Sequence, residues 1–144
     1  MNTVETKTVR NFYDLCACFQ IREEVFVNEQ QVDAEEEWDD FDRTATHLIA
    51  FREGAAVGTC RYRSTSNGVK MERFAVLSAA RGFGVGAALL KQALEQVLNH
   101  PIKGEIYLHS QEHAMNFYGR FGFRAVGERF YEADIPHFKM IYKP

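Results

Sequence analysis

One stretch of the chain restricts its possible folds more than any other: residues 81–90, with the sequence RGFGVGAALL. It follows residues 69–77, which have the composition of a strand, and it opens a helical segment that ends near Asn99. Because glycine has no Cβ, its backbone takes left-handed angles and lets a ligand approach closely. The first amides of a helix have no partners inside it and lie at the positive end of its dipole. The stretch predicts an anion site suited to phosphate, and the alternative is a plain turn with glycines at tight bends.

The size and charge of the chain limit its class. Its 144 residues, 46% of them hydrophobic, fit one domain over residues 1–144 with a substantial core. A net charge of −3 gives no basic field for nucleic acid, and no apolar run approaches the ~20 residues that cross a membrane. The three cysteines form no C-x-x-C pair, so we expect reduced thiols in a cytoplasmic protein. Cys60 is expected to be a small core residue rather than a nucleophile.

Hydrophobic spacing and turn residues predict alternating strands and helices. Asn11 is placed to cap a first helix, and an amphipathic piece follows over residues 21–30. Gly54 and Gly68 lie in tight turns between three antiparallel strands. Two more helices are expected, one opened by the glycine stretch and one over residues 114–121. The predicted strands are residues 3–10, 47–52, 56–63, 69–77, 105–109, 123–130 and 138–142.

The strand over residues 69–77 carries a charge on each face. On a strict period of two, Glu72 shares a face with Phe74 and Val76, and Arg73 lies on the opposite face with Met71. If one face packs on a helix, at least one of the two charges must be buried, paired or in a cleft.

Residues 33–42 are strongly acidic and include Trp38 and Phe41. They lack the glycine and the terminal glutamate that a calcium loop needs in this register. Two interpretations stay open: a solvated surface loop, or a negative lid with aromatic side chains that attracts a cationic amine. In the preceding helical piece, Arg22 and Glu29 are either solvated charges or lining residues of a substrate cleft.

Two motifs together resemble the GNAT superfamily of N-acetyltransferases. Residues 81–86 match the acetyl-CoA signature R/Q-x-x-G-x-G/A between a strand and a helix. Residues 114–123 match A-x-x-x-Y-x-x-x-G-F on a later helix. Residues 22–30, the acidic stretch and residues 135–137 are similar to a small bacterial ElaA-like branch, so the resemblance covers nearly the whole chain. It implies an α+β fold with a mixed, mostly antiparallel sheet of six to seven strands, flanked by about four helices and splayed at the acetyl-CoA site.

The resemblance also implies roles for individual residues. The pyrophosphate of acetyl-CoA would lie on the turn and helix start, which comprise Arg81, Gly82, Phe83, Gly84, Val85, Gly86 and Ala87. The pantetheine arm would pair with the backbone of Phe74, Ala75 and Val76 as an added strand. Tyr118 matches the general acid toward the departing thiolate, although spacing alone makes it a core tyrosine. Gln111 stands where many members have a cofactor-contacting asparagine.

The expected reaction is direct transfer of an acetyl group from acetyl-CoA to a primary amine in a ternary complex, without a metal. An alkyl amine has a pKa of about 10.4 and must lose a proton before it attacks. Glu72 is the candidate base, and the alternative is that it pairs with Arg61, Arg63 or Lys70 across the sheet. The residues that can contact the acceptor are Arg22, Glu29, Arg61, Arg73 and His137. The acceptor is a small molecule or a peptide, and the terminal strands can support a homodimer.

Three other interpretations compete with this one. Residues 82–87 formally match the dinucleotide fingerprint G-x-G-x-x-A, but that fold places it in a first strand–helix–strand unit. Residues 109–113 match the zinc pattern H-x-x-E-H, which requires both histidines on one helix face. Finally, the domain can bind acetyl-CoA or CoA without transferring anything, as a sensor or an interaction module.

Overall fold

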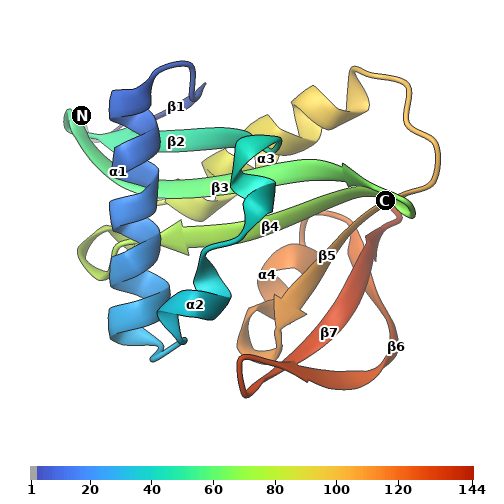
Figure 1. Ribbon diagram of the computed structural model, residues 1–144. Helices are drawn as coiled ribbons and strands as arrows, with labels where there is room; N and C mark the ends of the chain where they lie inside the picture. The colour runs from blue at the N-terminus through green and yellow to red at the C-terminus, as the bar shows by residue number, and fades with distance from the viewer. Residues whose placement is uncertain (1–2) are drawn as a thin grey trace.

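The computed structural model describes residues 3–144, which form one seven-stranded sheet in the order β1-β2-β3-β4-β5-β7-β6 (Figure 1). The pairing of β4 with β5 is parallel, and the other five pairings are antiparallel. This is the mixed, mostly antiparallel sheet that the resemblance implied. The strands are β1 Val4–Thr8, β2 Thr46–Arg52, β3 Ala55–Thr65, β4 Gly68–Val76, β5 Glu105–Gln111, β6 Phe123–Glu132 and β7 Ile135–Tyr142.

Helices cover both faces of the sheet. In Figure 1, α1 lies in front of β2–β4, α2 lies beside the lower end of α1, and α3 lies behind these strands. Asn11 caps α1 as predicted, because its side chain accepts a hydrogen bond from the Asp14 amide. The α-helices are α1 Phe12–Arg22, α2 Ala34–Glu37, α3 Val85–Leu98 and α4 Met115–Gly119. A π-helix, η1 Glu23–Glu29, continues α1. The short 3₁₀ turns are η2 Asp40–Arg43, η3 Ser78–Ala80 and η4 Glu112–Ala114.

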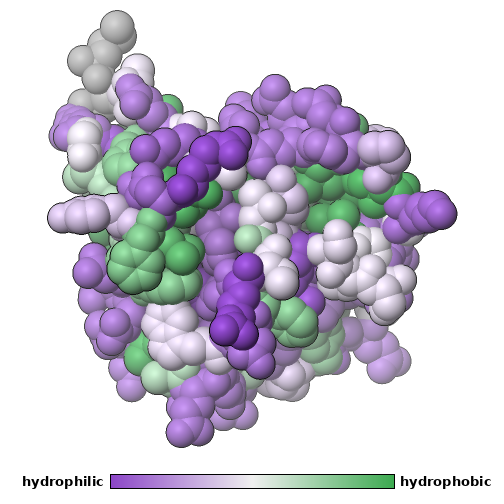
Figure 2. All heavy atoms as spheres, turned by 45° about the horizontal axis from the view of Figure 1, so that its top comes forward, coloured by the Kyte–Doolittle hydropathy of each residue, from purple (hydrophilic) through white to green (hydrophobic). Residues whose placement is uncertain are grey.

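The core lies mainly between the sheet and α3. The apolar stripe of α3 packs there against residues such as Leu48 and Met71, and a smaller cluster joins α1 and η1 to Ala75. The space-filling view shows a mostly hydrophilic surface with apolar groups in separate patches (Figure 2). Within residues 3–144, no helix has both the length and the apolar character needed to cross a membrane.

The last two strands are longer than predicted. They meet in a two-residue turn at Ala133 and Asp134, which have φ values of 49° and 61°. Positive φ at both central residues is typical of a type I′ hairpin, for which Asn-Gly is the usual signal. Because this turn lacks glycine and Pro136 follows it, the sequence did not predict that strand pairing continues to Glu132 and Ile135.

The sheet opens between β4 and β5. Their pairing covers three residue pairs, from Gly68 with Glu105 to Lys70 with Tyr107, and within the described chain no further pair joins them. The two strands then diverge (Figure 1). The splay implied by the resemblance is therefore present, at the position where β4 continues into the glycine turn.

A bulge in β4 changes which side chains share a face. Thr59 pairs with Ala75 and Arg61 with Glu72, so β4 carries one residue more than β3 between these pairs, and Arg73 has a φ of +60°. The prediction of a strict two-residue period is wrong here. Glu72 and Arg73 both contact charged groups on the side of α1 and α2, while Met71 and Phe74 pack on the α3 side.

Candidate active site

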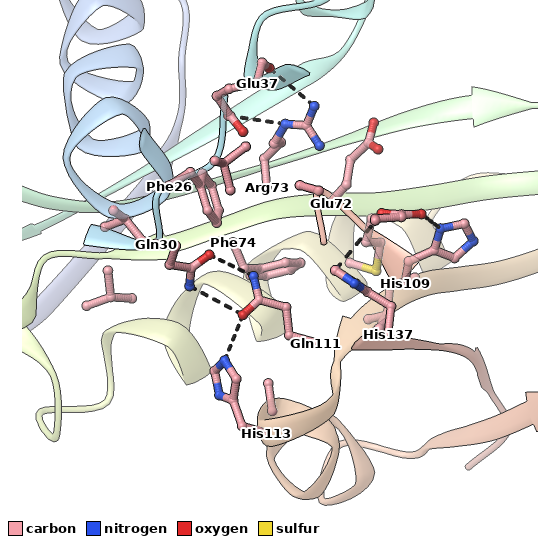
Figure 3. A pocket seen from close by; sticks show the side chains of 18 of the residues that line it. Phe26, Gln30, Glu37, Glu72, Arg73, Phe74, His109, Gln111, His113 and His137 are labelled. Carbon is pink, nitrogen blue, oxygen red and sulfur yellow. Dashed lines mark hydrogen bonds and ion pairs between the residues drawn. The ribbon is translucent and has the colours of Figure 1, made fainter. Parts of the chain in front are cut away.

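A cavity of about 750 Å³ occupies the space where β4 and β5 diverge (Figure 3). Its walls come from η1, β4, β5, α4 and the β6–β7 hairpin. The predicted site residues that line it are Glu29, Glu72, Arg73, Phe74, Val76, Arg81, Gln111, Tyr118 and His137. Residues more than a hundred positions apart in the sequence therefore meet at one site.

The glycine turn has an open backbone and follows directly on Arg81, a lining residue of the cavity, whereas residues 82–87 themselves do not line it. Gly82 and Gly84 have φ values of 86° and 83°, and a Cβ added at either position would meet nothing within 4 Å. Gly84 is the N-cap of α3, a helix of fourteen residues. At Gly86, by contrast, a Cβ would lie 3.4 Å from the Phe117 ring, so this glycine allows close packing of α3 on α4. The local geometry fits a diphosphate on the turn.

Arg81 is held at the rim of the cavity by two partners. Its Nε donates to the Val76 carbonyl oxygen at 3.1 Å, and its two terminal nitrogens lie 2.6 and 2.8 Å from the Glu29 carboxylate oxygens. The hydrogen bonds from Arg81 hold the pKa of Glu29 below its usual value. The sequence singled out both residues, but it did not predict that they pair.

The segment proposed to hold the pantetheine arm lies along the cavity. Phe74 and Val76 line it, and the Ala75 side chain packs on the other face with Ile21 and Val25. Phe74 also contacts Tyr118 edge to face, with 5.6 Å between ring centroids. The divergence from β5 leaves this side of β4 next to the cavity rather than next to a strand.

Tyr118 belongs to the core, as its spacing predicted, and it also lines the cavity. Burial raises its pKa far above the usual range, so the phenol stays protonated at neutral pH. A protonated phenol can donate a proton or a hydrogen bond.

Gln111 and Gln30 bridge the two walls of the cavity. Gln111 Nε2 donates to Gln30 Oε1 at 2.8 Å, and Gln30 Nε2 donates to Gln111 Oε1 at 3.3 Å (Figure 3). His113 Nε2 lies 2.7 Å from the same Gln111 oxygen. The amide in the asparagine position of the motif is therefore at the cavity and connected to η1.

Glu72 is surrounded by cations, which is the alternative considered for it. It accepts a close hydrogen bond from Arg63, its Oε1 lies 2.9 Å from an Arg61 nitrogen, and its Oε2 lies 3.4 Å from Lys70 Nζ. Burial alone would raise its pKa, but these contacts outweigh burial and lower it. A carboxylate stabilised in this way is a weak proton acceptor, so the geometry does not favour the predicted general-base role.

Two arginines predicted to contact the acceptor lie outside the cavity. Arg22 and Arg61 are each 1% exposed and belong to a buried ion network. Arg22 pairs with Glu37 and Asp42, and Arg61 pairs with Asp39 and Asp42. Their side chains hold the acidic segment on the sheet, which corrects the expectation that they bind substrate. Arg73 pairs with the same segment and does line the cavity.

The acidic segment is neither a plain solvated loop nor a wholly negative lid. Its carboxylates at Glu37, Asp39 and Asp42 are neutralised by arginines, and Trp38 covers the Arg22 guanidinium at 5.0 Å from the ring centroid. The exposed part keeps acidic side chains, and Glu36 is one that lines the cavity.

A cluster of two histidines and a glutamate lies at the other end of the cavity. His109 Nδ1 is 2.7 Å from Glu132 Oε1, and His137 Nε2 is 4.0 Å from Glu132 Oε2. His137 was predicted to border the site, but Glu132 was missed because the predicted strand stopped at residue 130. The pairing of Phe130 with His137 brings the hairpin residues together.

The fold does not support the competing motifs. His109 lies in β5 and bonds Glu132, whereas His113 lies in η4 and bonds Gln111, so the two do not share a helix face. The β4–β5 contact is the one parallel pairing in residues 3–144, unlike a doubly wound dinucleotide fold. Cys60 is buried in the core as predicted, and burial raises its pKa.

Comparisons with known proteins agree with this architecture. Residues 9–144 match the acetyltransferase (GNAT) domain family. A protein of Bacillus subtilis (strain 168) described as the uncharacterized N-acetyltransferase YjcF is 37% identical over 92% of this chain and 94% of its own. The crystal structure of an acyl-CoA N-acyltransferase from Pseudomonas aeruginosa superposes with a TM-score of 0.84, at 34% identity over 98% of this chain and 99% of that chain. The crystal structure of Escherichia coli ElaA superposes with a TM-score of 0.85. It is 31% identical over 96% of this chain and 99% of the ElaA chain.

Proposed function

The chain belongs to the GNAT acetyltransferase family, whose chemistry is acyl transfer from acyl-CoA, and we propose that it transfers an acetyl group from acetyl-CoA directly to a primary amine. The observation that carries this proposal is the succession of three features along one side of the sheet, with Arg81 linking the glycine turn to the cavity. These are the open glycine turn at the start of α3, the divergence of β4 from β5, and a buried tyrosine between them.

The residues of these three features fit acetyl-CoA. The amides of residues 82–87 would hold the pyrophosphate at the positive end of the α3 dipole. The β4 backbone at residues 74–76 would pair with the pantetheine amides, which is strand addition at an exposed edge. Acetyl-CoA supplies the activated acyl group when bound, and the protein supplies position and proton transfer.

The proposed reaction requires two proton transfers, and we assign one of them to Tyr118. An alkyl ammonium must lose a proton before the amine attacks, and the departing sulfur must gain one. Tyr118 is buried, protonated and on the cavity wall, so we assign it the donation of a proton toward the leaving sulfur. The paired Glu72 keeps Arg61, Arg63 and Lys70 together on the sheet.

A thermal-unfolding experiment with acetyl-CoA, CoA and NAD in parallel tests the ligand. A ligand at a hundredfold its Kd adds about 2.7 kcal/mol, which for a chain of this size raises Tm by roughly 5–10 °C. We expect a shift with both CoA forms and none with NAD. Failure of acetyl-CoA to shift Tm would overturn the proposal.

The second candidate function is a non-catalytic sensor of acetyl-CoA, since the glycine turn would serve both. The tyrosine in the cavity wall favours an enzyme. Amine-dependent release of free CoA thiol from acetyl-CoA separates the two functions, because a sensor binds without releasing thiol.

A further inference from the structure

Two imidazoles flank one carboxylate at the end of the cavity formed by the β6–β7 hairpin. In Figure 3, dashed lines from His109 and His137 meet on a single carboxylate, that of Glu132. All three residues line the same cavity as Tyr118. Residues of three different strands thus meet at this point, and neither the glycine turn nor the ion network of the acidic segment uses them.

Hydrogen-bond partners determine where the protons lie on His137. Its Nδ1 is 2.7 Å from the Ile135 carbonyl oxygen, which can only accept, so Nδ1 carries a hydrogen. In the neutral ring, Nε2 then has a lone pair. His137 is nearly buried, and Nε2 is directed toward Glu132 Oε2. The ring is therefore fixed with its basic nitrogen inside the cavity.

Glu132 is placed to stabilise a charge on that nitrogen. Its Oε1 accepts a hydrogen bond from His109 Nδ1. Burial would raise its pKa, but His109, Lys70 and His137 outweigh burial and lower it, so the carboxylate is ionised at neutral pH. The 4.0 Å between Oε2 and His137 Nε2 exceeds a hydrogen bond, and a small approach would close it when the ring is protonated.

We propose that His137 is the catalytic proton acceptor for the amine and that Glu132 is its positioning residue, an assignment that rests on the proposed acetyl transfer. The incoming ammonium hydrogen-bonds His137 Nε2 and Glu132 Oε2. One N–H bond of the ammonium breaks, an Nε2–H bond forms on His137, and the amine keeps the electron pair with which it attacks the acyl carbon. The resulting imidazolium donates its new hydrogen to Glu132.

Two other charged groups of the cavity do less for this step. Facing the cluster are Lys70 and Glu72 from β4 and His109 from β5. Lys70 is a cation and Glu72 is bound by cations, so neither takes a proton readily. Imidazole ordinarily changes charge between pH 5 and 8, as a base at neutral pH should.

His137 also lies beside the proposed cofactor position. It is the β7 partner of Gln111 in β5, and residues paired in this way present their side chains to the same face. Gln111 stands in the motif position that contacts the cofactor in many family members. His137 therefore lies beside the motif position that is expected to contact the cofactor.

The test compares two acceptors of matched size, ethylamine and 2,2,2-trifluoroethylamine. Ethylamine is protonated at neutral pH and trifluoroethylamine is not, so only the first needs a base before attack. Thiol release from acetyl-CoA is measured against pH for wild type, His137→Gln, Glu132→Gln and the control His100→Gln, an exposed residue that lies two positions after the end of α3. Acetyl-CoA affinity is measured by calorimetry for each protein.

We expect His137→Gln to lower kcat/KM for ethylamine about a hundredfold and for trifluoroethylamine less than about tenfold, with acetyl-CoA affinity retained. For ethylamine, kcat/KM of wild type should level off near neutral pH, whereas that of His137→Gln should keep rising in proportion to the free amine, whose pKa is about 10.4. The wild-type profile should be displaced in Glu132→Gln and unchanged in His100→Gln. An equal loss for both amines, or an unchanged pH profile, would overturn the assignment.

A second measurement does not depend on turnover. In the wild-type protein saturated with CoA, which carries no acetyl group to transfer, ethylamine should shift the ring NMR signals of His137, identified by their loss in His137→Gln. Signals that stay unchanged would also overturn the assignment. A wild-type protein that fails to bind acetyl-CoA at all would overturn the proposed function instead, so the two failures are distinguishable.

Discussion

Arg81 and Glu29 form a two-pronged ion pair across the rim of the cavity, with nitrogen–oxygen distances of 2.6 and 2.8 Å. The pair joins the end of η1 to the glycine turn, residues that are 52 positions apart. It places an acidic side chain beside the proposed pyrophosphate position and commits the guanidinium to an internal partner. Glu29, which lies outside the turn, therefore also affects the affinity of the turn for anions.

Glu29→Gln should increase the affinity for acetyl-CoA by roughly two- to fivefold. The substitution removes a negative charge and releases Arg81, and exposed pairs of this kind are worth about 0–1 kcal/mol. Calorimetric titration of the variant and of Glu24→Gln, an exposed control on the same helix, checks this. Weaker binding by Glu29→Gln would mean instead that the carboxylate positions the arginine for the ligand.

Gly84→Glu should lose acetyl-CoA binding by at least about a hundredfold, because it adds an anion at the positive end of α3. Gly54→Glu is a matched control, since Gly54 has a φ of +79° and, like Gly84, an open position for a Cβ. Both variants carry similar backbone strain, so an equal Tm loss is expected in each. Normal binding by Gly84→Glu would contradict the assignment of the turn.

Tyr118→Phe should keep the fold and the affinity for acetyl-CoA and lower kcat by about a hundredfold, the usual contribution of a general acid. Steady-state kinetics with the amine in excess, beside the binding measurement, tests this. Unchanged turnover would contradict the assigned role. Phe121→Leu, on the same segment but outside the cavity lining, controls for altered packing of α4.

Acid should lower the folding stability of the protein because it protonates Asp39. Burial opposes ionisation, but hydrogen bonds from Arg61 and its charge lower the pKa of Asp39 from 3.8 to about 2. The stabilisation is present above the unfolded pKa and is lost as the pH falls from about 4 to about 2. We therefore expect Asp39→Asn to lower the free energy of unfolding at neutral pH by about 1–2 kcal/mol, a range that allows for solvent screening of a partly exposed group.

Urea titrations at a series of pH values check this prediction. The difference between wild type and Asp39→Asn should shrink as the pH falls through that range. The exposed neighbour Asp40→Asn should follow wild type throughout. A difference that is independent of pH would show that Asp39 contributes packing rather than charge.

The parts of the site that were predictable from the sequence are those fixed by neighbours in the chain. The glycine turn follows from residues within one turn of α3, and the position of Tyr118 follows from the spacing of one helix and its end. Turn residues likewise located the strands of the meander. Each of these features depends on backbone angles that a few adjacent residues determine.

The parts that were not predictable depend on partners far apart in the sequence. Nothing in the order of residues 71–75 indicates an extra residue, because a bulge exists only relative to the partner strand. The pairing of Arg22 with Asp42 requires the acidic segment to fold back over α1. Glu132 was missed because its turn has no glycine, so the strand was ended too early.

The divergence of β4 from β5 also bears on the aggregation and the half-life of the protein in the cell. A strand edge with unpaired main-chain groups is the kind of surface through which proteins aggregate, unless something covers it. In the proposed complex the cover is a metabolite rather than a further strand. The abundance of the folded protein would then follow the supply of that metabolite, and starvation for it would shorten the protein's half-life before any change in gene expression.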